Sequence, residues 1–281
     1  MQGKTVVVTG ATQGIGYEAA KALAAMGARV IVTARDRRRG EEAASKISAV
    51  AGSPVELVLC DFASMASIRE GAAAVRERTD RLHVLLNNAG ALYLERQTSV
   101  DGLELTFATN HIGYFLFTRL LQGLLERTAP ARIVNVASAA HRMARHGPTF
   151  DDLERTRGYR GFEVYGETKL MNILFTRELA RRLEGKRVTA NSLHPGVIAS
   201  GFGKNNRGAI GWILRHAAHL VFLTPEEGAR TSVYLCSSPE VEGVSGRYFA
   251  KCREVRPRRP AENDGAARRL WELSERLTGL A

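Results

Sequence analysis

Short apolar runs alternate with helix-forming segments along most of the chain. The runs are rich in Val, Ile and Leu, and they predict strands at Thr5–Val8, Val30–Thr33, Val55–Cys60, His83–Leu86, Arg132–Ala137, Val188–Leu193 and Val244–Phe249. The segments that predict helices are Tyr17–Met26, Arg38–Val50, Met65–Arg78, Leu103–Glu126, Tyr165–Leu183 and Pro225–Cys236. Strands that alternate with helices at this spacing are joined by right-handed crossovers. The pattern therefore predicts an α/β fold, a doubly wound parallel sheet of about seven strands with helices on both faces.

The composition is that of a globular protein. Among the 281 residues, 44% are apolar and 25% are charged, which excludes a disordered chain. No uncharged apolar run is long enough for a membrane-spanning helix, and the first residues enter a strand without space for a signal peptide. The three cysteines are an odd number in unrelated segments and are expected to be reduced thiols. We therefore expect a cytoplasmic protein.

An excess of basic residues is the unusual feature of the composition. Lys and Arg number 40 against 29 Asp and Glu, which gives a net charge of +11. The basic residues are scattered from Lys4 to Arg276 without a nucleic-acid-binding motif, so we expect no nucleic acid as a partner. An anionic small ligand or an anionic membrane surface explains the sign of the charge equally well.

A glycine-rich turn, TGATQGIG, follows the first predicted strand and leads into the first predicted helix. Backbone N–H groups at a helix N-terminus bind phosphate when no side chain holds it away. Gly10 permits the tight turn, Gly14 the close approach of the backbone, and Gly16 the close helix–sheet contact. The turn therefore predicts a dinucleotide site made by Gly10, Thr12, Gln13, Gly14, Ile15 and Gly16. The alternative is a flexible glycine turn without a ligand.

The end of the second predicted strand bears on the choice of nicotinamide cofactor. NAD sites usually place an acidic residue there, whereas this chain has Ala34 and Arg35. Arg35 and the three arginines at 37–39 stand at the start of a predicted helix, where cations oppose the helix dipole. An adenosine 2′-phosphate would relieve this conflict and pair with Arg35, which favours NADP. Asp36 leaves NAD open, because a carboxylate there could bind the ribose.

Further motifs follow in a fixed order: CDFAS at 60–64, NNAG at 87–90, TNHIGYF around Asn110, IVNVASAAH around Ser138, YGETK at 165–169 and HPGV at 194–197. With the glycine-rich turn, this set resembles the short-chain dehydrogenase/reductase family over nearly the whole chain. The closest resemblance is to the retinol-dehydrogenase-like reductases. It rests on RDRRRGEEA, on TNHIGYF, on the long interval from Ser138 to Tyr165 and on the tail SGRYFAKCREV…RLWELSERLTGL.

The resemblance implies a single Rossmann-type domain over residues 1–281. Residues 1–138 are expected to form mainly the cofactor half, and residues 139–250 the catalytic and substrate half. Residues 251–281 are expected to form a C-terminal tail and helix. The apolar positions that predict this helix are Ala267, Leu270, Leu273 and Leu277.

Four residues carry the expected catalytic chemistry. Tyr165 and Lys169 are four residues apart, so on a helix they share one face, where the ammonium is expected to lower the pKa of the phenol. The pair can then act as a general acid that protonates a carbonyl oxygen as hydride arrives at the carbon. The resemblance implies that Ser138 orients the substrate oxygen and that Asn110 holds a water linked to Lys169. The alternatives are a turn serine and a kink-stabilising asparagine.

The resemblance also implies cofactor contacts after the later strands. Asp61 resembles the carboxylate that binds the adenine amino group, and Ser200 stands where Thr is usual, a change that keeps the hydroxyl. Besides these two and the catalytic Tyr165 and Lys169, the expected contacts are Phe62, Asn88, Ala89, Gly90, Pro195, Gly196 and Val197. The seven histidines show no metal-ligand spacing, so no metal is expected.

These residues predict an NADP(H)-dependent oxidoreductase that interconverts a carbonyl compound and an alcohol, with that small molecule as its partner. The alternative is a non-catalytic NADP-binding regulatory protein on the same fold; such proteins tend to have lost Tyr or Lys, and this chain has both. Family membership does not select among retinaldehydes, steroids, quinones and small ketones. The helices at 103–126 and 165–183 are expected to pair subunits into a dimer or tetramer, as the resemblance implies.

The segment 201–223 is expected to be a lid over a lipophilic substrate. It follows HPGV closely, has four glycines in its first half and then carries apolar residues at helical spacing. One alternative is an ordinary helix packed on the core. Another is peripheral membrane contact through residues 207–223, because Trp212 and the nearby arginines suit a lipid headgroup boundary.

Overall fold

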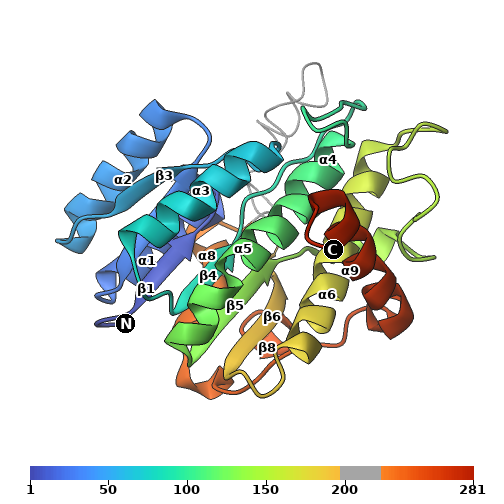
Figure 1. Ribbon diagram of the computed structural model, residues 1–281. Coiled ribbons are helices and arrows are strands. Elements are labelled where there is room, and N and C mark those ends of the chain that lie inside the picture. The colour runs from blue at the N-terminus through green and yellow to red at the C-terminus, as the bar shows by residue number, and fades with distance from the viewer. Residues whose placement is uncertain (197–222) are drawn as a thin grey trace.

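The computed structural model of the chain describes residues 1–196 and 223–281 (Figure 1). In this part of the chain one sheet has eight strands in the order β3–β2–β1–β4–β5–β6–β7–β8. The strands are β1 (Thr5–Val8), β2 (Arg29–Ala34), β3 (Glu56–Leu59), β4 (Val84–Asn87), β5 (Ala131–Val136), β6 (Val188–His194), β7 (Tyr248–Ala250) and β8 (Arg253–Glu254). Neighbouring strands pair in parallel from β3 to β7, and β8 pairs antiparallel with β7. The structure confirms the doubly wound, mainly parallel sheet that the sequence predicts.

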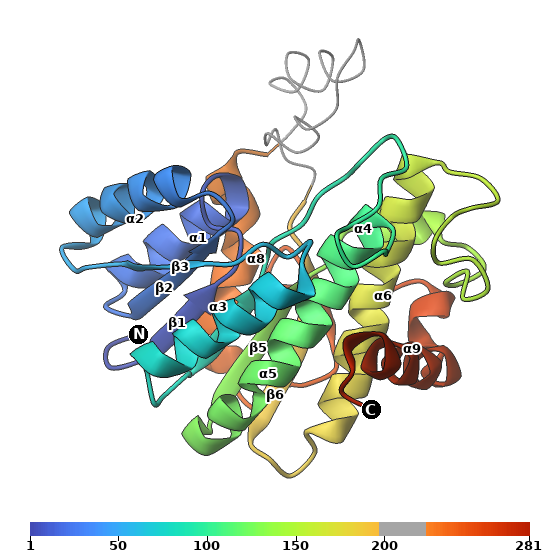
Figure 2. The same ribbon diagram turned by 45° about the horizontal axis from the view of Figure 1, so that its top comes forward.

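Helices cover both faces of this sheet. α1 (Gly14–Ala25), α2 (Arg37–Ala51) and α8 (Pro225–Ser237) pack together on one face. α3 (Met65–Arg78), α5 (Gly113–Thr128) and α6 (Gly161–Arg182) lie side by side on the other (Figure 2). Across residues 1–196 and 223–281, no helix is both long and apolar enough to cross a membrane.

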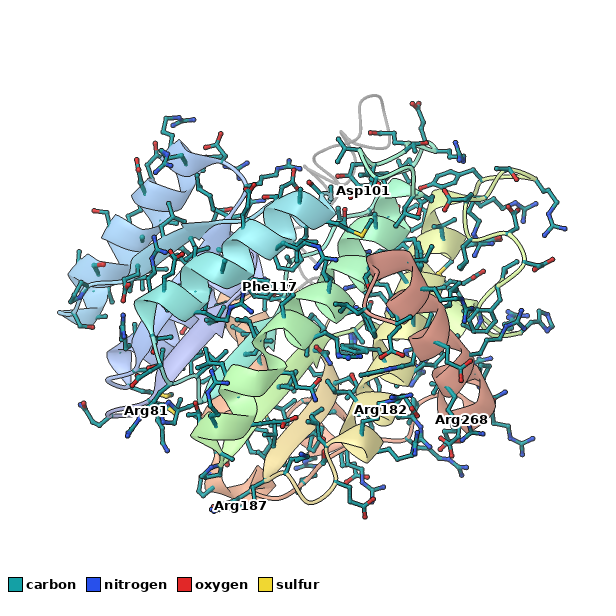
Figure 3. All side chains as sticks on the ribbon, viewed as in Figure 1. Arg81, Asp101, Phe117, Arg182, Arg187 and Arg268 are labelled. Carbon is teal, nitrogen blue, oxygen red and sulfur yellow. The ribbon has the colours of Figure 1, made fainter. Side chains whose placement is uncertain are left out.

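Alternate residues of the central strand face two separate hydrophobic cores. Val7 of β1 is buried with Leu85 in the core beneath α3 and α5, whereas Val6 and Val8 belong to the core beneath α1 and α8. Because both faces are covered, the three successive residues Val6, Val7 and Val8 are all apolar and do not alternate with polar residues. In the core beneath α3 and α5, Phe117 lies between these two helices (Figure 3) and is fully buried.

The long helix expected at 103–126 is interrupted. It begins as α4 (Leu105–Phe107), continues as a π-helical turn, η1 (Ala108–Ile112), and becomes α5 at Gly113. Such turns insert one extra residue into an α-helix and are frequent at functional sites. This turn contains Asn110, whose side-chain amide donates to the carbonyl oxygen of Ala91 at 2.9 Å and whose Oδ1 accepts from Ala91 N at 2.8 Å. Asn110 therefore holds the turn against the loop that follows β4.

The last part of the sheet also differs from the sequence prediction. β7 begins at Tyr248 rather than Val244, and β8 follows in a segment expected to be a polar tail. Lys251 and Cys252 join the two strands with φ angles of 51° and 57°. Two successive residues with positive, left-handed φ angles form the tight turn of a two-residue β-hairpin, and such turns usually contain Asn and Gly. Because the chain has neither residue there, its pattern does not predict the hairpin.

The C-terminal helix α9 (Asp264–Thr278) confirms the helix expected from apolar positions in the tail. Its Trp271 is buried against α5 and α6, with ring centroids 5.1 Å from Phe115 and 5.9 Å from Phe175. Arg182, near the end of α6 (Figure 3), places its guanidinium carbon 4.3 Å from the centroid of the same indole. α9 therefore lies on faces of α5 and α6, the two helices for which the resemblance implies subunit pairing.

Replacing Trp271 by Ala should lower the free energy of unfolding by about 3–5 kcal/mol, because a buried aromatic side chain leaves a cavity between helices. Denaturant unfolding followed by circular dichroism measures the change. Arg268→Ala is a matched control on the same helix. Arg268 is exposed on the outer side of α9 (Figure 3), so its loss should change stability by less than about 0.5 kcal/mol. Equal effects of the two substitutions would show that Trp271 does not dock α9.

Candidate active site

The residues that the sequence singles out come together at the carboxyl-terminal edge of the sheet. The glycine-rich turn follows β1, Arg35 follows β2, Asp61 follows β3 and the NNAG segment ends β4. Ser138 follows β5, and Pro195 and Gly196 follow β6. Because parallel strands end at the same edge, residues far apart in the sequence share one region of the molecule.

The glycine-rich turn is shaped by close contacts. Gly10 has a φ of 67°, and a Cβ there would lie 2.7 Å from Cα of Ala89 in the NNAG segment. Gly14 opens α1 with a φ of 62°. At Gly16, a Cβ would lie 2.6 Å from the carbonyl oxygen of Gly10. A side chain at Gly10 or Gly16 would thus push the turn away from its neighbours.

Hydrogen bonds join this turn to the NNAG segment. Oγ1 of Thr9 accepts from the backbone N–H groups of Asn88 at 2.8 Å and Ala89 at 3.0 Å. The Asn88 side-chain amide donates to the carbonyl oxygens of Thr9 and Gly10 at 2.9 and 3.2 Å. The strand order reverses here, since β1 lies between β2 and β4. Open α/β sheets bind their ligands at such a switch point.

The N-terminus of α1 is suited to an anion. Gln13 precedes the helix without making a capping hydrogen bond to it, and the first turn holds no acidic side chain. By contrast, Asp36 and Ser64 cap α2 and α3 with their side chains. Uncapped N–H groups beside a turn that excludes Cβ atoms fit the pyrophosphate of a dinucleotide. Thr12 and Ile15 lie half-buried in the same turn.

Asp36, the residue that leaves NAD open in the sequence, acts as the N-cap of α2. Its Oδ1 accepts from the backbone N–H of Arg39 at 2.8 Å. Arg37 and Arg38 form ion pairs, at 3.7 and 2.6 Å, with the glutamates four residues ahead of each on α2. These contacts offset the unfavourable placement of cations at the start of this helix.

Arg35 and Arg39 instead lie toward the glycine-rich turn and the loop after β4. Nη2 of Arg39 donates to Oε1 of Gln13 at 3.1 Å. The exposed Arg35 hydrogen-bonds the hydroxyl of Tyr93; burial raises the pKa of Tyr93, and the guanidinium opposes part of that rise. The sequence assigns Arg35 to the cofactor and misses Arg39 and Tyr93. In the sequence, the place of Arg39 in the run of arginines could have indicated its role, whereas nothing in the sequence marks Tyr93.

Asp61 and Phe62 begin the loop after β3. Oδ1 of Asp61 accepts from the backbone N–H of Ala63 at 3.0 Å, at the sheet edge where the adenine contact is predicted. Phe62 is buried against α5, where a Cβ on Gly113 would lie 2.7 Å from the ring. Its ring also meets that of Phe117 edge to face, with centroids 5.4 Å apart. The side chain of Phe62 therefore belongs to the hydrophobic core rather than to the cofactor region.

Tyr165, Ser138 and Lys169 form one cluster at the same edge. Nζ of Lys169 lies 5.6 Å from the ring centroid of Tyr165, one turn away on α6. The hydroxyl of Ser138 hydrogen-bonds Tyr165 and accepts from the backbone N–H of Ala140 at 3.1 Å. Lys169 Nζ also donates to the carbonyl oxygen of Val136 at 3.0 Å. The cluster therefore joins α6 to the end of β5.

Burial shifts both titratable groups of this cluster toward their neutral forms. It raises the pKa of Tyr165 well above that of a free phenol, and the hydrogen bond with Ser138 opposes only part of the rise. Burial also lowers the pKa of Lys169 to about 7. The pKa of Tyr165 therefore lies above that of a free phenol and not below it, as its pairing with Lys169 led us to expect, because loss of hydration is the larger effect. The neutral phenol is nevertheless the form that can donate a proton.

Asn110 joins this cluster through hydrogen bonds to its neighbours. Its Nδ2 donates to Oγ1 of Thr168 at 3.0 Å, and Thr168 donates to the carbonyl oxygen of Tyr165 at 2.8 Å. A Cβ on Gly90 would lie 3.3 Å from Oδ1 of Asn110 and 3.5 Å from Nζ of Lys169. The structure thus brings all four predicted catalytic residues together beside the end of the NNAG segment.

His194 is a site residue that sequence reasoning missed. Its Nδ1 accepts from the backbone N–H groups of Ala139 at 3.1 Å and Gly196 at 3.3 Å. It therefore holds the loop after β5, next to Ser138, against the loop after β6. Burial lowers the pKa of His194 to about 4, so the ring is neutral at physiological pH and can accept these bonds. Its one sequence signal is its place in HPGV, directly before Pro195.

Gly196 has a φ of 99°, a conformation that favours glycine. Val197, Ser200 and residues 201–222 lie outside the described part of the chain. The cofactor contacts at Val197 and Ser200 therefore stay predictions, as do the lid and membrane-contact hypotheses for 201–223.

Comparison with known proteins agrees with this geometry. A family model described as enoyl-(acyl carrier protein) reductase matches residues 10–250. Retinol dehydrogenase 14 from Homo sapiens is 44% identical over 299 residues, which cover 100% of this chain and 88% of that protein. A crystal structure of a protein from Mycobacterium paratuberculosis has a TM-score of 0.77 and 31% identity, and covers 99% of this chain and 94% of that chain. The NADP active-site complex of RhlG from Pseudomonas aeruginosa has a TM-score of 0.67 and 26% identity, and covers 89% of this chain and 94% of that chain.

The free energy of unfolding should fall as the pH drops from 6.5 toward 4, in part because of His194. In this window the unfolded state binds a proton at His194 that the folded state does not, so stability rises with pH. His194→Asn keeps an acceptor near Nδ1 but does not titrate. It should make the dependence shallower, by up to about 1.4 kcal/mol per pH unit.

Denaturant unfolding at a series of pH values gives these slopes. His146→Asn, which replaces an exposed histidine, should keep the wild-type slope. An unchanged slope in His194→Asn would refute a buried neutral His194.

Proposed function

Because the chain belongs to the short-chain dehydrogenase/reductase family, we propose that it is an NADPH-dependent oxidoreductase that reduces a lipophilic aldehyde or ketone to an alcohol. The observation that carries the proposal is the cluster of Ser138, Tyr165 and Lys169 beside a turn that fits a dinucleotide pyrophosphate. Gly10, Gly14 and Gly16 would hold the pyrophosphate against the N-terminus of α1. Asp61, Asn88 and Ala89 would line the adenosine.

Tyr165 is the proposed general acid. When bound, NADPH supplies a hydride to the carbonyl carbon. Burial keeps the phenol of Tyr165 protonated, so it can donate that proton to the carbonyl oxygen as negative charge develops there. Ser138, hydrogen-bonded to the same phenol, would orient the oxygen through its hydroxyl. In the direction of alcohol oxidation, Tyr165 would first lose its proton, and the phenolate would then accept the proton of the alcohol.

Lys169 and Asn110 would support this proton transfer. The Lys169 ammonium, next to the Tyr165 ring, would stabilise the phenolate that remains after the proton leaves. A pKa of about 7 allows Lys169 to exchange a proton near neutral pH, as a group that restores the phenol must. Asn110 bonds to the backbone of Ala91 and to the side-chain hydroxyl of Thr168 beside the cluster. That Asn110 also holds a water stays a prediction from the resemblance.

Two arginines support NADP over NAD. Arg35 at the end of β2 and Arg39, bonded to Gln13 in the glycine-rich turn, flank the region where the adenosine 2′-phosphate would lie. A guanidinium can pair with a phosphate through two parallel hydrogen bonds. One carboxylate oxygen of Asp36 already accepts a hydrogen bond at the N-terminus of α2. The solved structure of RhlG, a structural relative, is a complex with NADP, which also supports NADP as the cofactor.

The relatives support a long apolar substrate. Retinol dehydrogenases 14 and 13 are named for an alcohol with an extended hydrocarbon chain. We propose a long-chain aldehyde of comparable character, for which each extra buried CH₂ would contribute up to about 0.8 kcal/mol. The lid expected at 201–223 would cover such a substrate.

The cellular location and the oligomeric state of the enzyme are also proposed. We infer a cytoplasmic enzyme, with peripheral membrane contact through residues 207–223 as a further hypothesis. The dimer or tetramer expected from the resemblance would have to use the parts of α5 and α6 that α9 leaves free. The alternative function, a non-catalytic NADP-binding regulator, would not require Tyr165 and Lys169 to lie together.

Tyr165→Phe should bind NADPH normally and lose at least about 100-fold in kcat, because the ring is kept and only the proton donor is removed. NADPH oxidation with all-trans-retinaldehyde measures the rate, and calorimetry measures cofactor binding. Tyr234→Phe on α8, which loses only a hydrogen bond to Glu240, is the control and should keep the wild-type rate. A near wild-type rate in Tyr165→Phe would reject the assignment. A wild-type protein that binds NADPH but reduces no carbonyl would favour the regulator.

Arg35→Ala and Arg39→Ala should each raise the KM for NADPH by about tenfold to a hundredfold, the loss expected for a charge-assisted hydrogen bond. The KM for NADH should change little, because NADH lacks the 2′-phosphate. Arg38→Ala is the control in the same run of arginines, since Arg38 pairs with Glu42. Initial rates with both cofactors give the comparison. Equal losses for NADPH and NADH, or a wild-type preference for NADH, would refute the choice of NADP.

A further inference from the structure

We propose that a basic cavity beside the start of α9 binds the phosphate group of a phosphate ester. The cavity is a broad depression, open to solvent, with a volume of about 630 Å³. Its lining residues come from the loop between β5 and α6 and from the segment at the start of α9. The residues that bear on the argument are Arg145, Phe150, Arg259, Pro260, Asn263 and Arg269. The proposal is independent of the proposed reductase activity.

Three positive charges line this cavity without a counter-charge. Arg145, Arg259 and Arg269 contribute guanidinium groups, and none of the lining residues is acidic. Within residues 1–196 and 223–281, none of the three forms an ion pair, although many other arginines of the chain do. Like charges that share a cavity repel each other, and a bound anion removes that repulsion.

The acidic residues next to the lining segments in sequence already have other partners. Asp151 and Asp152, which follow Phe150, both pair with Arg157. Glu262 pairs with Arg256 at 2.9 Å, and Asp264 pairs with Arg177 of α6 at 2.8 Å. These carboxylates are thus paired with arginines that do not line the cavity, and Glu262 also attracts Arg259 electrostatically. The cavity therefore keeps a net positive charge that the folded chain does not neutralise from these segments.

The two walls of the cavity are held in place by one buried histidine. His141 accepts, through Nε2, from the backbone N–H of Arg258 at 3.3 Å, directly before Arg259. Its carbonyl oxygen accepts from Ala144 N at 3.2 Å, directly before Arg145. His141 is 1% exposed, so both anchors lie inside the molecule. The backbone of both walls is therefore fixed by the fold, and the side chains of the three arginines extend from it and are exposed.

One guanidinium is also held by an aromatic ring. The guanidinium carbon of Arg269 lies 4.5 Å from the ring centroid of Phe150, within the range of cation–π contacts. Thr149, next to Phe150, is fixed by a hydrogen bond from its backbone N–H to Glu167 at 3.0 Å. Less side-chain freedom is then lost when an anion binds Arg269.

The cavity also offers a surface for the organic part of an ester. Pro148, Phe150, Pro260 and Ala266 supply apolar lining beside the three arginines. A phosphate monoester or a phospholipid headgroup combines the two chemistries, whereas inorganic phosphate uses only the charges. Arginine forks match phosphate oxygens through paired hydrogen bonds. Glycerol 3-phosphate is the soluble probe of this chemistry, and phosphatidic acid in phosphatidylcholine vesicles is the membrane probe.

The test compares two triple variants of the full chain with equal loss of charge. The site variant combines Arg145→Gln, Arg259→Gln and Arg269→Gln. The control variant combines Arg81→Gln, Arg127→Gln and Arg187→Gln, three exposed arginines away from the cavity, of which Arg81 and Arg187 are labelled in Figure 3. Calorimetry measures glycerol 3-phosphate binding in saturating NADP⁺, and flotation measures vesicle binding. Circular dichroism checks that each variant folds.

Wild type and the control variant should bind at least one of the two probes, and the site variant should bind it at least about tenfold more weakly. Binding of glycerol 3-phosphate would assign a soluble ester, and binding of vesicles alone would assign a lipid headgroup. Equal affinity in the folded site variant and in wild type would overturn the proposal. So would failure of wild type to bind either probe at millimolar concentration.

Discussion

Lys169 brings a positive charge into the interior, and the groups around it are constrained by that charge. The residue is 3% exposed, and its Nζ donates to Val136 O and lies 5.7 Å from the Tyr114 ring and 5.6 Å from the Tyr165 ring. A buried cation is costly unless other groups replace its water. One carbonyl and two aromatic faces do so in part, and the pKa of about 7 shows the remaining penalty.

The NNAG segment links this buried charge to the glycine-rich turn. At its start, Asn88 and Ala89 bond to Thr9 and Gly10 at the end of β1. At its end, Gly90 leaves the space in which the side chains of Asn110 and Lys169 meet. The segment therefore sets the position of the glycine-rich turn relative to Asn110 and Lys169. Such spacing is what a hydride-transfer enzyme requires, because the cofactor and the general acid must reach one substrate carbonyl together.

Much of the fold could be predicted from the sequence because its signals are local. Strands such as β1 carry consecutive apolar residues when both faces of a parallel sheet are covered, and the motifs fall at strand ends. The pairing of Tyr165 with Lys169 follows from helical spacing alone.

The features that were not predicted depend on contacts between distant segments. The bond from Arg39 to Gln13 needs α2 to lie beside α1, and His194 acts only where the ends of β5 and β6 meet. The raised pKa of Tyr165 reflects burial, which spacing does not give. The left-handed hairpin at Lys251 and Cys252 carries no turn signature. Phe62 fits a cofactor motif, yet its ring fills the core.

The central claim, transfer of hydride to a carbonyl carbon, is tested most directly by following the hydrogen itself. NADPH labelled with deuterium on one or the other face of the nicotinamide C4 is incubated with the protein and all-trans-retinaldehyde, and the alcohol is examined by mass spectrometry. The account predicts that one of the two labelled cofactors places deuterium on the carbinol carbon and the other does not. Alcohol without deuterium from either cofactor, or no alcohol at all from long-chain aldehydes, would contradict it.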